Sequence, residues 1–158
     1  MSDININEQA NLVWSIADRG LRNNFKKGQY AHYIVPLVIL KRFDSVLQKT
    51  KDDVLKRYET VSEWKIDDMR EKTLREASGY NFYNTSRYDL QKLMDDPNNL
   101  RTNMIDYIRG FSSNVRDIME NPKGLDIITK ISNMDDKKIL YTVMEALNDP
   151  KIDLHPDR

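Results

Sequence analysis

The stretch YIVPLVILKRFD, residues 33–44, decides the fold of this 158-residue chain. All seven residues from Ile34 to Leu40 are apolar, and the chain then turns abruptly polar at Lys41 and Arg42. A helix that is apolar almost all round is packed on several sides, whereas an amphipathic helix keeps one face in solvent. We therefore predict a central core helix over residues 29–48 whose far end emerges into solvent.

A proline lies inside this predicted helix. Pro36 has no backbone N–H, so the carbonyl of His32 loses its helical partner, and we expect the helix to kink or to begin close to Pro36. Beyond the proline the pattern becomes amphipathic, with inward positions at Leu40, Phe43 and Leu47. The opposite face is predicted to be a polar stripe of Lys41, Asp44 and Gln48.

Apolar residues recur at helical spacing through the rest of the chain. Thr60 and Glu63 have the spacing of a capping box, which predicts a helix that begins there and stops at Gly79. The stretch 79–90, rich in Tyr and Asn, is predicted to be a structured loop. Further helices are expected over residues 7–22, 54–58, 90–94, 100–111, 115–119, 125–131 and 136–148.

The composition agrees with a helical protein. Gly and Pro number five each, and no run of residues alternates as a strand does. We predict an all-α fold, a compact multi-helix domain of about seven to nine helices. One helical domain is expected over residues 1–150, and the proline-containing tail 151–158 is expected to be a connector rather than a finished terminus.

Composition also limits the compartment and the partners. The chain has no cysteine, its N-terminus lacks the pattern of a signal peptide, and its apolar runs fall far short of a membrane span. We expect a soluble cytoplasmic protein that does not contact a membrane. The net charge is zero, which argues against one dominant electrostatic partner.

The sequence contains no recognisable set of catalytic residues. Ser62 and Lys65 match a serine–lysine motif without its companion motifs, and the two histidines stand apart. Paired aspartates lie near expected helix starts, where they complement the helix dipole. The glycines form no phosphate-cradling loop. From the residues alone we predict no catalytic, cofactor-binding or metal-binding residue, and interpret the domain as an interaction module.

One stretch concentrates positive charge. Residues 19–27, RGLRNNFKK, contain no acid, and their cations are Arg19, Arg22, Lys26 and Lys27. Two interpretations remain open. The stretch is either a solvated loop between two helices or a patch that contacts phosphates.

Two stretches carry a resemblance to a known family. LVWSIADRGLRNNF (12–25) resembles the Leu-Trp, Ala-Asp, Leu-Arg signature that opens the modification (M) subunit of type I restriction–modification enzymes. YAHYIVPLVILKRFD (30–44) is similar to the next helix of that family, with its aliphatic run around a central Pro. NFYNTSRYDL (81–90) and KIDLHPDR (151–158) are weaker echoes, and the second resembles the connector into the methyltransferase domain. The resemblance therefore implies that residues 1–150 are the helical N-terminal domain of an M subunit and that residues 151–158 begin the connector to a catalytic domain absent from this chain. Gly20 departs from the family pattern near the end of the first helix.

The resemblance implies a parent enzyme that transfers a methyl group from S-adenosylmethionine to adenine N6 in DNA. In that family two M subunits join one specificity (S) subunit, which reads the target sequence, and R subunits add restriction. The catalytic domain carries a glycine-rich cofactor loop and a motif for the flipped base. Neither is present in this chain, so we expect it alone neither to bind S-adenosylmethionine nor to methylate DNA.

The resemblance also suggests a role for the helical domain, which in the family is thought to help the complex assemble and close around double-stranded DNA. Such a role needs cations directed at phosphates more than base readout. The candidate DNA contacts are Arg19, Arg22, Lys26, Lys27, Lys41 and Arg42. The alternative is a protein–protein interaction module that never touches DNA.

Overall fold

The structure is a computed structural model, and it describes residues 11, 12, 14, 15, 18, 21, 22, 24–63, 65–150 and 152, apart from the side chain of Lys27. Within these residues there are seven α-helices, four short 3-10 helices and no strand beyond one isolated bridge between Asn84 and Phe111. The all-α prediction is confirmed, with the number of helices at the low end of the predicted range. Most of the helix expected over residues 7–22 lies outside the described residues.

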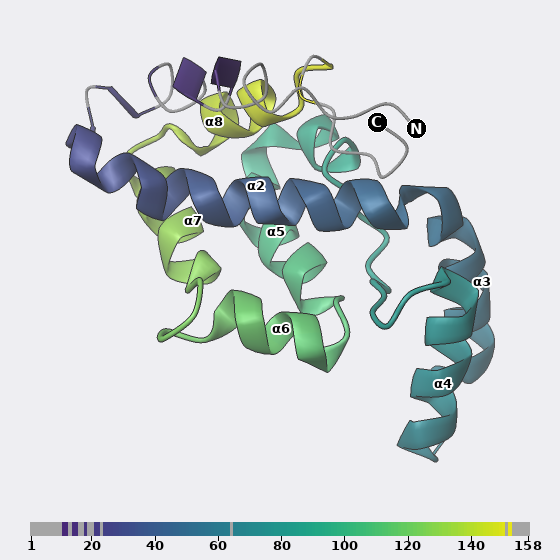
Figure 1. The fold of residues 1–158 in the computed structure, drawn as a ribbon. Coiled ribbons are helices and arrows are strands. Elements are labelled where there is room, and N and C mark those ends of the chain that lie inside the picture. The colour runs from purple at the N-terminus through teal and green to yellow at the C-terminus, as the bar shows by residue number, and fades with distance from the viewer. Residues whose placement is uncertain are drawn as a thin grey trace.

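The helix α2 (Tyr30–Leu47) crosses the molecule from end to end (Figure 1). The other α-helices are α3 (Lys51–Val61), α4 (Asp67–Ser78), α5 (Leu100–Arg109), α6 (Ser113–Glu120), α7 (Ile127–Asp136) and α8 (Leu140–Leu147). The 3-10 helices are η1 (Lys27–Gln29), η2 (Gln48–Thr50), η3 (Lys92–Asp95) and η4 (Pro97–Asn99). None of the helices in the described part of the chain is both long and apolar enough to cross a membrane.

The predicted core helix is confirmed within one residue at each end, but the predicted effect of its proline is not. The helix α2 begins at Tyr30, six residues before Pro36, and continues through the proline as one helix (Figure 1). Pro36 itself is buried, next to the buried Leu37 and close to Ile34. Burial of Ile34, Pro36 and Leu37 outweighs the single backbone hydrogen bond that the proline removes, although Val35 leaves 48% of its surface exposed.

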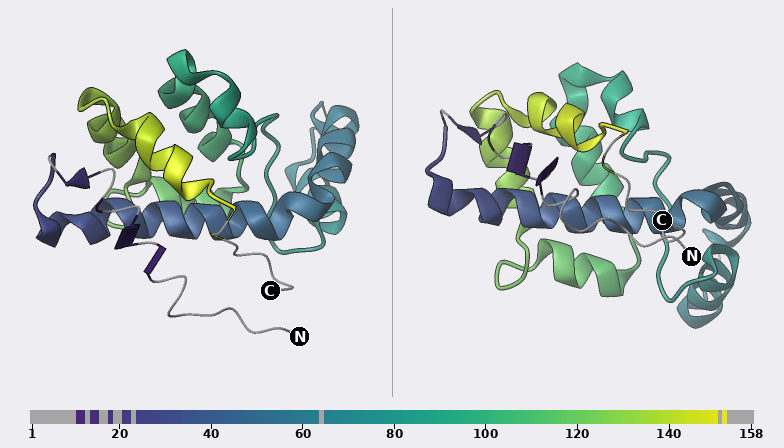
Figure 2. Two further views of the ribbon diagram at one scale, coloured as in Figure 1. Left: turned by 90° about the horizontal axis from the view of Figure 1, so that it is seen from above. Right: turned by 45° about the horizontal axis from the view of Figure 1, so that its top comes forward.

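The body of the molecule consists of α2 and α5 to α8. Its core is one apolar cluster built from the inner faces of these helices, with fully buried Leu40, Met104, Ile108, Ile131 and Val143 near its centre. Phe43 packs against this core and makes edge-on contacts with Phe82 and Phe111, whose ring centroids lie 5.1 and 6.1 Å from its own. Two further views show α5 to α8 gathered along α2 (Figure 2).

The helices α3 and α4 form an antiparallel hairpin, residues 51–78, which we call the arm. The arm stands at one end of α2 and extends away from the body (Figures 1 and 2). Its small apolar cluster consists of Val54, Val61 and Leu74 of the arm and Tyr83 of the following loop, with Ala77 packed against it. The arm therefore depends on few apolar contacts and must be held to the body in another way.

Of the two predicted ends of the arm's second helix, the start is wrong and the stop is right. Thr60 lies inside α3, and α4 begins at Asp67 without a side-chain cap, so the expected capping box does not form. The helix α3 runs on to the buried Val61, because burying that residue favours another helical turn. The predicted stop at Gly79 is confirmed, since its φ of 80° is a left-handed conformation that favours glycine.

The predicted polar stripe on α2 also needs correction at Asp44. Its Oδ1 accepts a hydrogen bond from the Tyr107 hydroxyl at 2.8 Å and one from the Leu90 backbone N–H at 3.3 Å. Asp44 therefore faces α5 and the loop before η3 rather than open solvent. A charged residue on the polar side of a helical pattern can face the protein when hydrogen-bond partners meet it there.

Candidate functional site

The structure describes part of the predicted basic cluster. Arg22 and Lys26 are exposed and lie just before α2. Arg19 and the side chain of Lys27 lie outside the described residues. The predicted role of these four cations in contacting DNA stays a prediction.

Arg22 has an acidic partner on its own segment. Its Nη2 forms an ion pair and a hydrogen bond with Asp18, one helical turn earlier. That hydrogen bond is the main reason why the pKa of Arg22 is raised above its usual value. A phosphate at this position would have to compete with Asp18 for the guanidinium.

Lys41 and Arg42 are half-buried and lie further along α2. At a helical rise of about 1.5 Å per residue, Lys41 stands roughly 16 Å beyond Tyr30 along the helix axis. Lys41 lines a groove of about 430 Å³ together with Asp44 and Asp89. The described candidates therefore occupy two separate places on α2 rather than one continuous patch.

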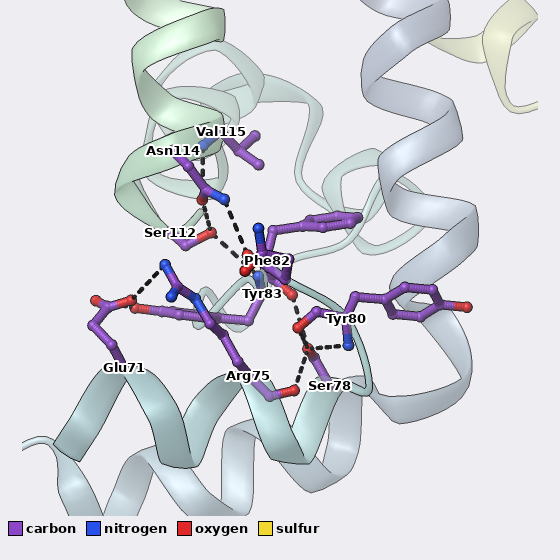
Figure 3. Close-up of polar contacts among 10 residues, drawn as sticks. Glu71, Arg75, Ser78, Tyr80, Phe82, Tyr83, Ser112, Asn114 and Val115 are labelled. Atoms are coloured by element: carbon purple, nitrogen blue, oxygen red, sulfur yellow. Dashed lines mark hydrogen bonds and ion pairs between the residues drawn. The ribbon is translucent and has the colours of Figure 1, made fainter. Parts of the chain in front are cut away.

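A dense set of polar contacts joins the arm to the body (Figure 3). At the end of α4, the buried Ser78 hydroxyl lies within hydrogen-bond distance of three carbonyl oxygens, of Arg75 at 3.0 Å, Tyr80 at 3.2 Å and Phe82 at 2.8 Å. It also accepts the Tyr80 backbone N–H at 3.1 Å. The chain leaving the arm is thus folded tightly around one serine side chain.

The same chain then pairs with the start of α6 (Figure 3). The Ser112 N–H donates to the Tyr83 carbonyl at 2.9 Å, and the Tyr83 N–H donates to the Ser112 hydroxyl at 3.3 Å. The Tyr83 phenol reaches back into the arm and donates to Glu71 Oε1 at 2.6 Å. Tyr83 therefore links α4 to the body through both its backbone and its side chain.

A second connection runs through Lys51, the first residue of α3. Its Nζ donates to Asn84 Oδ1 at 2.9 Å and to the Tyr88 carbonyl at 3.0 Å. Burial lowers the pKa of Lys51 to about 8, although Asp44 and Asp89 favour its charged form. Burial likewise raises the pKa of Asp44, despite the hydrogen bond from Tyr107.

Surface hollows accompany these contacts. One of them, of about 1060 Å³, lies between α4 and the start of α6, where four acidic and four basic side chains balance one another. A cavity of about 230 Å³ lies beside Lys51, close to the groove at Lys41. A further groove, of about 620 Å³, opens in the angle between the arm and α5. Its lining includes Tyr58 of α3, Arg87 of the loop and Arg109 of α5.

The described residues do not form a cofactor or metal site of a familiar kind. Gly28, Gly79, Gly110 and Gly124 lie at four separate turns, so no glycine-rich cradle for a nucleotide cofactor is built from them. No group of three or more acidic or histidine side chains that could hold a metal ion occurs in this part of the chain.

Comparison with protein families decides the classification. The family model described as HsdM N-terminal domain matches residues 9–147, which is most of the chain. The chain belongs to the HsdM N-terminal domain family. The resemblance carried by residues 12–25 and 30–44, to the N-terminal domain of the M subunit of type I restriction–modification enzymes, is thereby confirmed. Searches among curated proteins and among solved structures returned no match to this HsdM N-terminal domain.

Reasoning from the sequence missed the residues that meet in the angle between arm and body. Tyr58, Arg87 and Arg109 belong to three different elements, and none lies in a charge run. The one signal in the sequence was the loop NFYNTSRYDL (81–90). It resembles the family pattern, but the resemblance assigns no role to its Tyr, Asn, Ser and Arg residues. Tertiary contacts through Asn84 and Ser86 give this loop its conformation.

Proposed function

We propose that this domain helps the M subunit assemble with its partners and close around double-stranded DNA. The parent would be a site-specific adenine-N6 DNA methyltransferase that uses S-adenosylmethionine. Its partners would be a specificity subunit, a second M subunit and R subunits. Membership in the HsdM N-terminal domain family supports the type I context of this proposal.

The arm is the observation that carries the proposal. A hairpin that projects from a compact body provides a surface on two sides of an angle, as a clamp requires (Figure 1). The contacts of Ser78, Tyr83 and Lys51 hold the arm to the body at its base. An arm fixed in this way can make contacts to the backbone of a duplex with little loss of conformational entropy on binding.

The alternative function, a protein–protein module, has one observation in its favour. Near the start of α4, at the far end of the arm, Ile66 and Met69 leave 60% and 54% of their surface exposed. Exposed apolar side chains at the end of a projecting element suit contact with another protein subunit. The zero net charge of the chain agrees with this interpretation.

Two variants of the full-length M subunit separate these functions. The first replaces Arg19, Arg22, Lys26 and Lys27 by Ala, and the second carries Ile66→Ser and Met69→Ser. We expect the first to lower DNA affinity equally for cognate and non-cognate duplexes, measured by fluorescence anisotropy, because phosphate contacts carry no sequence information. Assembly with the other subunits is measured by light scattering after gel filtration.

The outcomes are distinct. Loss of assembly in the Ile66 and Met69 variant, with DNA affinity unchanged in both variants, would favour the protein–protein module. An M subunit from which residues 1–150 have been deleted, yet which assembles and binds DNA as the intact subunit does, would overturn both functions.

A further inference from the structure

We propose that the groove in the angle between the arm and α5 binds the sugar–phosphate backbone of DNA through Arg87 and Arg109. This inference rests on the proposed function and assigns to it a surface that the basic run at residues 19–27 does not include. The groove holds about 620 Å³ and is bounded by Tyr58 on the arm, the loop at residues 85–88 and Arg109 at the end of α5.

The groove carries an excess of positive charge. Arg87 and Arg109 are exposed, and the one acidic side chain in the described lining is Asp106. The Asp106 carboxylate accepts a hydrogen bond from the Ser86 hydroxyl at 3.1 Å, so one of its oxygens already has a partner in the protein. Cations and acids balance in the hollow between α4 and α6, whereas here the cations outnumber the acid.

Arg87 is held in a defined orientation. Its guanidinium carbon lies 4.9 Å from the centroid of the Tyr88 ring, and its Nη2 donates to the Tyr88 hydroxyl at 2.8 Å. These contacts orient the guanidinium and use one of its five N–H donors. A guanidinium oriented by stacking is well suited to bidentate contact with a phosphate.

Arg109 is held more loosely. Its Nε lies 3.7 Å from Glu120 Oε1, which is an ion pair beyond hydrogen-bond distance, and 65% of its side chain is exposed. Exposed pairs of this kind contribute little to stability, because solvent screens them. A phosphate with better geometry can therefore displace Glu120 from Arg109 at small cost.

Neutral donors complete the groove. Hydroxyl side chains of Tyr58 and Thr102 lie in the lining, and phosphate contacts in protein–DNA complexes commonly come from arginine together with Ser, Thr and Tyr. The loop that carries Thr85 is anchored, because the Thr85 N–H donates to the Gly110 carbonyl at 2.8 Å. A Cβ on Gly110 would lie 2.7 Å from the Ser86 nitrogen, so the loop and α5 approach as closely as glycine permits.

The test compares three variants in the full-length M subunit, assembled with its partner subunits. The groove variant carries Arg87→Ala and Arg109→Ala. The matched control carries Arg101→Ala, on the same helix as Arg109, and Lys123→Ala, so that the same charge is removed outside the groove. The third variant replaces Arg22 and Lys26 by Ala. The probe is a fluorescent duplex of cognate or arbitrary sequence, about 30 base pairs long, the upper end of the roughly 20–30 base pairs of a bent binding site.

The groove variant is expected to bind both duplexes several-fold more weakly. The slope of log affinity against log salt should become shallower by up to about 1.8, at about 0.9 for each phosphate that the protein no longer neutralises. The control should match the wild type, and assembly of all variants should be unchanged. Arg87→Lys alone should keep part of the salt slope, because the charge remains while the stacked, forked geometry is absent.

Three other outcomes would each contradict this inference. If the groove variant matches the wild type while the Arg22 and Lys26 variant loses affinity, this inference is wrong and the proposed function stands. If the groove variant and the control lose affinity equally, the effect is one of net charge and the groove is not a site. If removing residues 1–150 leaves DNA binding unchanged, the proposed function fails and this inference fails with it.

Discussion

The arm and the body of this domain are stabilised in different ways. The body buries a continuous apolar core along α2, whereas the arm has three buried residues in its apolar cluster and is held at its base by hydrogen bonds. Isolated helices of the length of α3 and α4 are marginal in water, so the arm depends on its contacts. A projecting element can therefore be ordered with few apolar contacts when polar contacts at its base fix its direction.

The difference between arm and body is tested most strongly by replacing one buried leucine in each region. Leu40→Ala in the body core should lower the free energy of unfolding by about 2–5 kcal/mol and destabilise the whole domain. Leu74→Ala in the arm, where the leucine is equally buried, should unfold the arm while the body stays folded. Urea denaturation followed by circular dichroism measures the first effect.

Hydrogen exchange measures the second effect. In Leu74→Ala, amides of α3 and α4 should exchange faster while those of α2 and α5 keep their protection. Equal loss of protection in both regions would show that arm and body unfold as one unit, and the comparison would fail.

A smaller effect concerns Lys51, which joins the arm to the loop. Its pKa of about 8 in the folded protein is below the usual 10.5, so the unfolded chain binds more protons and stability rises with pH between these values. We expect a gain of roughly 1–2 kcal/mol from about pH 7 to about pH 9.5. Denaturation midpoints across this range measure it.

The control for this prediction is Lys51→Met, which should abolish the rise because the titrating group is gone. Measurements stay below about pH 10, since Tyr83 and Tyr107 have raised pKa values and lower the stability above that pH, where the unfolded tyrosines ionise. A wild type whose stability is flat between pH 7 and 9.5 would show that Lys51 is solvated.

The next effect tests the phenol that links arm and body. Tyr83→Phe removes the donor to Glu71 and leaves a partly buried carboxylate with one partner fewer. We expect a destabilisation of about 1–2 kcal/mol, concentrated in faster hydrogen exchange of α4. The matched control is Tyr88→Phe, whose hydroxyl bonds to an exposed arginine and should matter less.

An effect of the same order is expected at the end of the arm helix. Gly79→Ala places a Cβ at a φ of 80°, where no other atom lies within 4 Å, so the cost is backbone strain alone. We expect about 1–2 kcal/mol, at the level that left-handed backbone costs a non-glycine residue. A destabilisation much larger than this, measured by thermal unfolding, would indicate a contact that the structure does not contain.

Much of the body could be predicted from the sequence because its helices bury one continuous apolar face. The spacing of Leu40, Phe43 and Leu47 located α2 within one residue at each end. The arm was predicted less well, since few of its residues are buried and the local signal at Thr60 and Glu63 pointed to a helix start inside α3. Local capping patterns are weak signals where burial of a later residue, here Val61, extends the preceding helix.

The candidate site could be predicted from the sequence even less well than the arm. A run of cations is visible in a sequence, so Arg22 and Lys26 were found, although Arg22 is paired with Asp18. Arg87 and Arg109 are far apart in the chain and neither lies in a run of cations, so no sequence pattern joins them. Chain folding brings both to one groove.

The sequence by itself determined the all-α class, the central helix and the family, because hydrophobic period and the local order of residues are properties of the chain. The tertiary structure decided that Asp44 faces Tyr107, that Lys51 is partly buried, and that the arm meets the body in an angle containing two arginines. These facts depend on which residues distant in sequence become neighbours. A charge or hydrogen-bond donor acquires its role from the partners it meets, and those partners are known once the chain has folded.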